Sequence, residues 1–283
     1  MRIFDPHIHM TSRTTDDYAA MAAAGVRAVV EPAFWLGQPR TNPGSFADYF
    51  DSLVGWEPYR AGQFGIRHHA TIALNPKEAN DPRCTEVLQL VPRYLLKEGV
   101  VAVGEIGYDA MTPDEDEAFA AQLAMARAAD LPALVHTPHR DKARGTQRSL
   151  AVVAESGIDP GRVVIDHLNE ATVRLVRESG CWAGFSIYPE TKMSPDRMVA
   201  LLREYGTGRM LVNSAADWGR SDPLLTVRTA EAMLAAGFDA ADVDRVMWRN
   251  PIEFYGQSGR LELDADPEPA ATYAGSSILR GGQ

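Results

Sequence analysis

Short runs of apolar and β-branched residues alternate with longer runs rich in Ala, Leu and Arg along most of the chain. The short runs predict buried strands, and the longer runs with helical spacing predict helices. The expected strands are Arg2–Phe4, Val26–Pro32, Ala70–Leu74, Val100–Ile106, Ala133–His136, Arg162–His167, Trp182–Ile187 and Met210–Asn213. The expected helices are Asp16–Ala24, Ser45–Gly62, Pro82–Glu98, Asp114–Ala129, Thr146–Ser156, Glu170–Ser179, Asp196–Tyr205 and Pro223–Ala236.

Eight successive strand-then-helix units predict an α/β fold, a (β/α)8 TIM barrel. A doubly wound open sheet shows the same alternation, and periodicity alone does not separate the two. A further helix near Asp242–Tyr255 is expected to pack against the barrel. We expect residues 1–260 to form one domain, and residues 261–283, rich in Ala, Gly, Pro, Asp and Ser, to form a loosely ordered tail.

Composition narrows the class of protein. The chain has 283 residues, 45% of them apolar, and a formal net charge of −10, so we expect no membrane partner and no binding of polymeric nucleic acid. The two cysteines, Cys84 and Cys181, are far apart in the sequence, which argues against a disulfide framework or a Cys-rich zinc module. No apolar run of about 18 residues is present, and a soluble, cytoplasmic protein is expected.

Two histidines, His7 and His9, follow the first expected strand. Alternate residues of an extended segment point to the same side, so both imidazoles can hold one divalent ion at the mouth of the barrel. Glu105, His136 and His167 lie at the ends of the fourth, fifth and sixth expected strands, at intervals of 31 residues. One βα unit is about 30 residues long, so these side chains are expected at the same height in the barrel.

Asp217 follows the eighth expected strand and completes a set of six candidate metal ligands: His7, His9, Glu105, His136, His167 and Asp217. Taken singly, each histidine can instead be a hydrogen-bonded core residue, and Glu105 a member of a salt bridge at the rim. Their joint place at strand ends, where barrel enzymes carry their chemistry, favours the metal site. His68 and His69 precede the third expected strand, and we interpret them as structural residues at the opposite end.

This arrangement resembles the TatD-like metal-dependent hydrolases of the amidohydrolase superfamily. The resemblance runs from His7-x-His9 through Val103-Gly104-Glu105-Ile106-Gly107, His136, His167 and Asp217 to Asn250-Pro251-x-x-Phe254. It implies two divalent ions: one held by His7, His9 and Asp217, the other by His136 and His167, with Glu105 as the bridge. The chain departs from the family pattern in Asn75-Pro76, where His-Pro is usual, and in the segment 213–217, where Glu-Thr-Asp is usual.

Ligands of this kind, without a thiolate, suit Zn, Mn or Mg. In a two-metal hydrolase the ions polarise the scissile group and lower the pKa of a bridging water to about 7. Besides Glu105 as the bridge, Asp217 is the expected catalytic group, as general base or proton shuttle. The sequence contains no Gly-x-Ser-x-Gly, P-loop or Gly-x-Gly-x-x-Gly motif that would indicate another chemistry.

Substrate contacts are expected from His139, Arg140 and Lys142 in the loop after the fifth strand, with Lys192 in the loop after the seventh. Arg140 is the candidate phosphate clamp, because a guanidinium can pair with two phosphate oxygens. A solvated charged loop is the alternative interpretation. After the second strand, Phe34, Trp35 and Leu36 are expected to wall an apolar part of a small substrate.

The sequence leaves three functions open. The favoured one is hydrolysis of a phosphoester in a small phosphorylated metabolite. The second is hydrolysis of an amide, a lactone or another carbonyl compound by the same metal site, and the ligand set does not separate it from the first. The third is a metal-binding or pathway-assembly protein without turnover.

Overall fold

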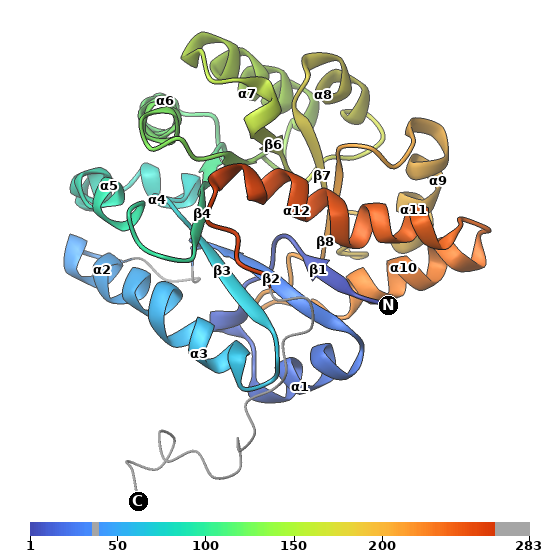
Figure 1. Ribbon diagram of the computed structural model, residues 1–283. Coiled ribbons are helices and arrows are strands. Elements are labelled where there is room, and N and C mark those ends of the chain that lie inside the picture. The colour runs from blue at the N-terminus through green and yellow to red at the C-terminus, as the bar shows by residue number, and fades with distance from the viewer. Residues whose placement is uncertain (36–39, 264–283) are drawn as a thin grey trace, which may run out of the picture.

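The computed structural model describes residues 1–35 and 40–263, so Leu36 and most of the expected tail lie outside the described residues. Eight parallel strands form one sheet in the order β1-β2-β3-β4-β5-β6-β7-β8, each paired with the next (Figure 1). Their bounds are β1 Ile3–Asp5, β2 Val26–Pro32, β3 Arg67–Ile72, β4 Val100–Gly107, β5 Ala133–His136, β6 Val163–Ile165, β7 Trp182–Ser186 and β8 Met210–Asn213. The strictly sequential order is that of a barrel and not of a doubly wound sheet.

The ring closes where the segments after β1 and β8 meet. The amide of His9 donates a hydrogen bond to the carbonyl of Ala216, and the amide of Ala215 donates to the carbonyl of His7, both at 2.9 Å. The predicted TIM barrel is therefore confirmed, and its closing seam runs through the two expected metal-binding histidines.

Helices cover the outside of the barrel (Figure 1). Their bounds are α1 Thr15–Ala23, α2 Pro43–Asp51, α3 Glu57–Gly62, α4 Pro76–Ala79, α5 Val91–Tyr94, α6 Pro113–Ala128, α7 Lys142–Ser156, α8 Val173–Ser179, α9 Pro195–Tyr205, α10 Leu225–Ala235, α11 Ala240–Asp244 and α12 Asn250–Tyr255. Short 3-10 turns occur at η1 Met10–Ser12, η4 Pro160–Arg162 and η6 Gly256–Ser258. Among the described residues, no helix is long and apolar enough to cross a membrane.

Proline accounts for three differences from the expected helices. The run 45–62 is divided into α2 and α3 by the π-helical turn η2 Ser52–Trp56, just before Pro58, and the run 242–255 by η5 Arg245–Arg249, just before Pro251. Proline lacks the amide that would continue the hydrogen-bond ladder, and its ring crowds the preceding turn. The run Pro82–Glu98 is mostly the 3-10 helix η3 Pro82–Gln89, followed by α5 with Pro92 in its first turn.

The third strand begins earlier than expected. Arg67 pairs with Ala28 and His69 with Val30, so His68 and His69 lie within β3 and not before it. Both are buried near the start of the strand. The polar run Arg67-His68-His69 does not have a strand-like sequence, and only its pairing with β2 makes it part of the sheet.

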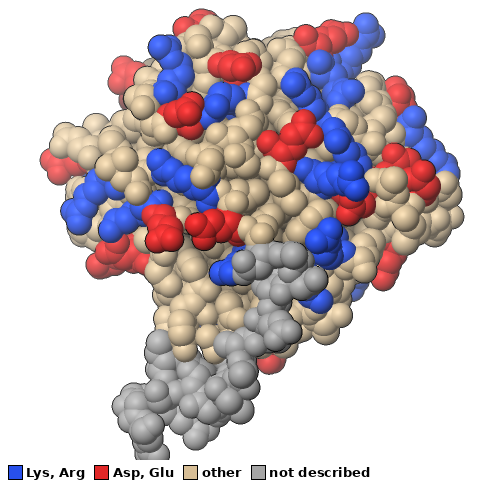
Figure 2. Space-filling model, viewed as in Figure 1, with Lys and Arg blue, Asp and Glu red and all other residues tan. Residues whose placement is uncertain are grey.

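The C-terminal helix closes the end of the barrel at which the strands begin (Figure 1). Trp248, Phe254 and Tyr255 pack into the inward-facing apolar cluster that includes Phe4. Nearby, Asn250 donates to the carbonyl of Met210, at the start of β8, and to that of Thr207, three residues earlier. Figure 2 shows this face with charges of both signs interspersed and no continuous basic stripe. The carboxyl ends of the strands are therefore left as the accessible end of the barrel.

Candidate metal centre

His7 and His9 lie side by side at the carboxyl end of β1. Their Nε2 atoms are 3.1 Å apart, and His7 Nε2 is 3.7 Å from Glu105 Oε1. Both side chains are almost fully buried. Two imidazole nitrogens and a carboxylate oxygen therefore face a common point, as the spacing predicts.

Glu105, near the end of β4, contacts the histidines at the ends of the next two strands, β5 and β6. Its Oε1 atom is 2.9 Å from His136 Nδ1 and 2.9 Å from His167 Nε2. Asn75, which stands where the resembling family usually has histidine, donates from Nδ2 to Glu105 Oε2 at 2.9 Å. The departure from the family pattern therefore supplies a side chain that fixes the orientation of the central carboxylate.

Gly107 explains part of the Gly-Glu-Ile-Gly run around Glu105. Its φ is 121°, and a Cβ atom there would lie 2.4 Å from the carbonyl oxygen of His136. Only glycine adopts this positive φ readily and leaves room for β4 to approach β5 so closely. The glycine therefore serves to bring the ends of the two strands together, and with them Glu105 and His136.

Three groups of side chains are close enough to hold an ion: His7 with His9 and Glu105; Glu105 with His136 and His167; and His7 with Asp166 and His167. Histidine and carboxylate donors suit divalent ions. The buried Nε2 atom of His136 has no hydrogen-bond partner among the described residues. Leaving a buried polar atom unpaired costs free energy, so an open nitrogen at this point fits a metal ligand.

Asp166 is a member of these groups that the sequence reasoning missed. Its Oδ2 atom is 2.6 Å from His7 Nδ1, and Asn213 Nδ2 donates to both of its oxygens at 3.1 Å. The signal available in the sequence was its place directly before His167. Gly184 on β7 makes room for it, because a Cβ atom there would lie 2.5 Å from Asp166 Oδ1.

Asp217 lines a cavity together with His9, Glu105, His136 and His167, but it belongs to none of the three groups. Its Oδ1 atom accepts hydrogen bonds from the amide of Gly219 at 2.8 Å and from the hydroxyl of Tyr188 at 3.4 Å. Its assignments as metal ligand and general base therefore stay predictions.

The charges of the centre favour metal binding. Burial opposes the charge of Glu105, but His136 and His167 hold its pKa well below the usual value, so it is a carboxylate. Burial, with the charge of His7, lowers the pKa of His9, and burial, with Lys192, lowers that of His167. These two imidazoles are therefore neutral near pH 7, which is the form that binds metal.

The pKa of His7 is shifted in the opposite direction to those of His9 and His167. Burial alone would lower its pKa, but the hydrogen bond to Asp166 and the negative charge of Glu105 raise it above the usual value. Burial opposes the charge of Asp166, but the interaction with His167 and the hydrogen bond from His7 lower its pKa, so it stays ionised. The pair resembles the carboxylate–histidine–metal arrangement, in which the outer carboxylate sets the tautomer and basicity of the ligand.

A cavity of about 130 Å³ opens over the ligands. It is lined by His9, Phe34, Trp35, Lys77, Glu105, His136, His139, His167, Lys192, Ala215, Asp217 and Trp218. Lys192 Nζ lies 3.1 Å from His167 Nδ1, and the rings of Trp35 and Trp218 meet edge to face at 6.2 Å. Lys77 and Trp218 were not predicted as site residues, although Trp218 directly follows Asp217 in the sequence.

The expected substrate residues separate in space. His139 and Trp35 line the metal cavity, as anticipated for substrate contacts. Arg140 instead lines a neighbouring cavity together with Lys77, Asp109 and His139. Lys142 turns back onto its own loop, where Nζ donates to Thr137 Oγ1 at 3.0 Å and to its carbonyl oxygen at 3.2 Å. Among the described residues, Lys192 and Lys77 are the cations that line the metal cavity, and Arg140 and Lys142 do not line it. Substrate contacts from Arg140 and Lys142 stay predictions.

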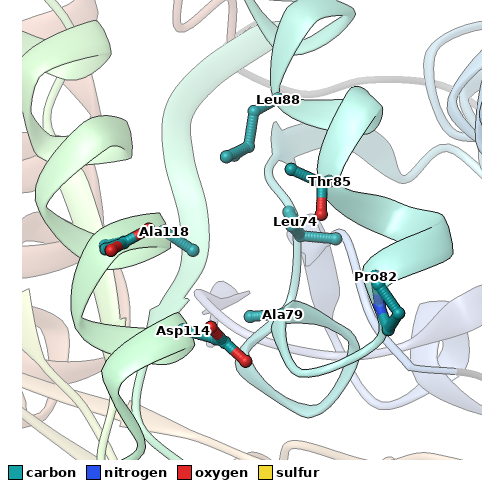
Figure 3. A pocket seen from close by; sticks show the side chains of 8 residues that line it. Leu74, Ala79, Pro82, Thr85, Leu88, Asp114 and Ala118 are labelled. Atoms are coloured by element: carbon teal, nitrogen blue, oxygen red, sulfur yellow. The ribbon is translucent and has the colours of Figure 1, made fainter.

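A cavity between η3 and α6 is larger, at about 250 Å³, but differs in character (Figure 3). Leu74, Pro82 and Leu88 contribute apolar walls, and Asp114 and Glu117 come from the first turns of α6. It has no imidazole in its lining. It therefore lacks the donor set that the cavity at the strand ends provides.

The fold and the buried histidine–carboxylate cluster together define a barrel hydrolase of the metal-dependent class. The chain matches the family described as TatD related DNase over residues 4–256, and it belongs to that family. It is thus a metal-dependent hydrolase, as the resemblance implies.

Known relatives agree with this assignment. An uncharacterised metal-dependent hydrolase of Methanocaldococcus jannaschii is 26% identical over 89% of this chain and 99% of its own length. The crystal structure of a TatD-like protein from Archaeoglobus fulgidus, also 26% identical, aligns with a TM-score of 0.75 over 89% of this chain and 99% of that one. A phosphotriesterase homology protein from Escherichia coli, with phosphate in its active site, aligns with a TM-score of 0.67 at 17% identity over 90% and 98%. This last likeness concerns the fold alone.

Proposed function

We propose that this protein hydrolyses a phosphoester of a small metabolite with two divalent ions. The observation that carries the proposal is a single cavity lined both by Glu105, which two groups of potential ligands share, and by Lys192. A shared carboxylate suits a bridge between two ions, and a cation beside the ions suits an anionic substrate.

His7, His9 and Glu105 would hold one ion, and Glu105, His136 and His167 the other, with Asp217 as a further ligand of the first. When bound, the ions supply Lewis acidity, which polarises the scissile group and makes water acidic enough to react at neutral pH. Zn, Mn and Mg all suit these donors.

The chain's own residues supply orientation and proton transfer. Asp217 accepts hydrogen bonds at Oδ1, so Oδ2 is the oxygen that we expect to take the proton from the attacking water. Lys192 neutralises charge on the phosphoryl oxygens, and its pKa is lowered chiefly by burial, with Glu105 opposing that effect. Phe34 and Trp35 cover the ligands and exclude bulk water, since Phe34 stacks on His9 with ring centroids 3.8 Å apart.

The size of the cavity favours a small substrate. About 130 Å³ is below the 300–1,000 Å³ that is usual for a whole small-molecule site, so it admits a scissile group and little else. The family description as DNase makes nucleic acid the competing substrate, and long DNA therefore belongs in the test.

The test is a panel of phosphomonoesters, phosphodiesters, amides, lactones and long DNA, assayed with Mn, Zn and Mg. We expect a small phosphoester to give the highest kcat/KM, and chelation to abolish turnover. Faster turnover of a lactone or amide would favour the carbonyl alternative, and faster degradation of DNA would overturn the size argument. Metal binding without turnover across the panel would favour a non-catalytic role.

A lysine variant separates phosphoester from carbonyl chemistry. Lys192→Met keeps the length of the side chain and removes its charge, so KM for phosphoesters should rise about tenfold or more. Lys97→Met, in the exposed segment before β4, is the control that should leave KM unchanged. A KM for phosphoesters that does not change in Lys192→Met would contradict anion binding by this residue.

A further inference from the structure

A second cavity of about 460 Å³ adjoins the metal cavity on the same face of the barrel. It is lined by Lys77, Asp109, Ala110, Met111, His139 and Arg140. Lys77 and His139 also line the metal cavity, so the two spaces meet across these side chains. A molecule whose scissile group reaches Glu105 can therefore extend past Lys77 and His139 toward Arg140.

The wall of this second cavity is fixed by a buried carboxylate. Glu115, at the start of α6, accepts hydrogen bonds from the amides of Asp109, Ala110 and Met111 at 2.7–3.1 Å. Glu115 itself is fully buried. The loop that forms this wall is thus held in place before any ligand binds, which reduces the entropy lost on binding.

The charge available in this cavity comes from Arg140. Lys77 is paired with Asp109 at 2.8 Å, and these two charges largely cancel. Burial and the charge of Lys192 lower the pKa of His139 to about 4, so that imidazole is neutral near pH 7. Arg140 is exposed and makes no hydrogen bond or ion pair within the part of the chain that the structure describes. Its guanidinium is left to pair with a ligand.

We propose that Arg140 and the cavity that it lines form a second subsite, which binds an anionic group of the substrate remote from the bond that is cleaved. This inference rests on the proposed function for the scissile end. It names the substrate class more narrowly, as a small phosphoester that carries a carboxylate or a second phosphate at its far end. Guanidinium groups bind either anion through paired hydrogen bonds.

The experiment compares two series of phosphomonoesters of straight-chain alcohols of increasing length, one ending in methyl and the other in carboxylate. At the length that spans the two cavities, the carboxylate series should have the higher kcat/KM, by about tenfold. Arg140→Ala should remove that difference by raising KM for the carboxylate series alone. Arg144→Ala, an exposed arginine of the same loop–helix junction that lines neither cavity, is the matched control and should change neither series.

A binding measurement separates this inference from the proposed function. Alkyl phosphonates that end in methyl or carboxylate are not hydrolysed, and calorimetry gives their Kd for wild type and Arg140→Ala. Tighter binding of the carboxylate probe that is lost in Arg140→Ala supports the subsite, even if no phosphoester is turned over. Equal binding of the two probes, or an equal loss for both in Arg140→Ala, would overturn it.

Discussion

His7 Nδ1 and Asp166 Oδ2 are 2.6 Å apart, and both side chains are buried. Asp166 is ionised, so the imidazole donates the proton of this hydrogen bond and its Nε2 atom is turned toward Glu105 and His9. The tautomer of His7 is therefore chosen by an aspartate 159 positions away in the sequence. Outer carboxylates of this kind position a metal ligand and raise its basicity.

Replacing Asp166 by Asn keeps the shape of the side chain and removes its charge. We expect the affinity for divalent ions to fall by about 10–100-fold, since His7 becomes less basic and less well oriented. Competition with a chelating dye measures this directly. Asp196→Asn, an exposed residue in the first turn of α9, serves as the control. Unchanged affinity in Asp166→Asn would show that His7 does not depend on this carboxylate.

Glu105→Ala removes the one carboxylate that two ligand groups share, so both ions should be lost. Elemental analysis of protein made with metal supplied gives the occupancy. The matched control is Glu117→Ala, an exposed carboxylate on α6 that should keep the metal. Full occupancy in Glu105→Ala would refute the bridge.

Asp217→Asn keeps an oxygen ligand but removes the proposed base. Metal should largely remain, while kcat falls by about 10²–10⁴, the usual contribution of general base catalysis. Loss of metal in proportion to rate would make Asp217 a ligand and not a base. A wild-type rate would point to another aspartate, and Asp222, which pairs with Arg228 at 2.7 Å, is the next to replace.

His69 predicts a dependence of stability on pH that is separate from the metal site. Burial, with the charges of His68 and Arg67, lowers its pKa to about 4. An unfolded histidine titrates near about 6.5, so the unfolded chain binds more protons between these values and stability falls as pH drops through that window. At about pH 5, the loss relative to neutral pH amounts to about 2 kcal/mol.

Urea unfolding of metal-free protein at neutral pH and at about pH 5 measures this effect. In His69→Gln, which cannot titrate, the difference between the two pH values should be smaller than in wild type by about 2 kcal/mol. The metal ligands are the same in both proteins, so their titration cancels in the comparison. An equal pH dependence in the two proteins would contradict a depressed pKa at His69.

The barrel and the core of its site could be predicted because their signals are local and repeated. A buried parallel strand is apolar whatever its partner, and a βα unit has a nearly constant length. Because Glu105, His136 and His167 are 31 residues apart, the alternation of strands and helices predicted them at the same height in the barrel. β5 and β8 have the predicted bounds, and the histidines and Glu105 meet at the strand ends.

What the tertiary structure decided depends on contacts between distant segments. Loops have no periodicity that would fix the directions of their side chains. The sequence therefore could not show that Asp166 bonds to His7 or that Asn75 holds Glu105. Nor could it show that Arg140 lines a second cavity. The polar start of β3 and the divided helices likewise depend on strand pairing and on backbone groups that proline leaves without a donor. The local sequence pattern thus determined which residues reach the end of the barrel. Packing across the ring determined which of these residues bond to one another, because such bonds join segments that are remote in sequence.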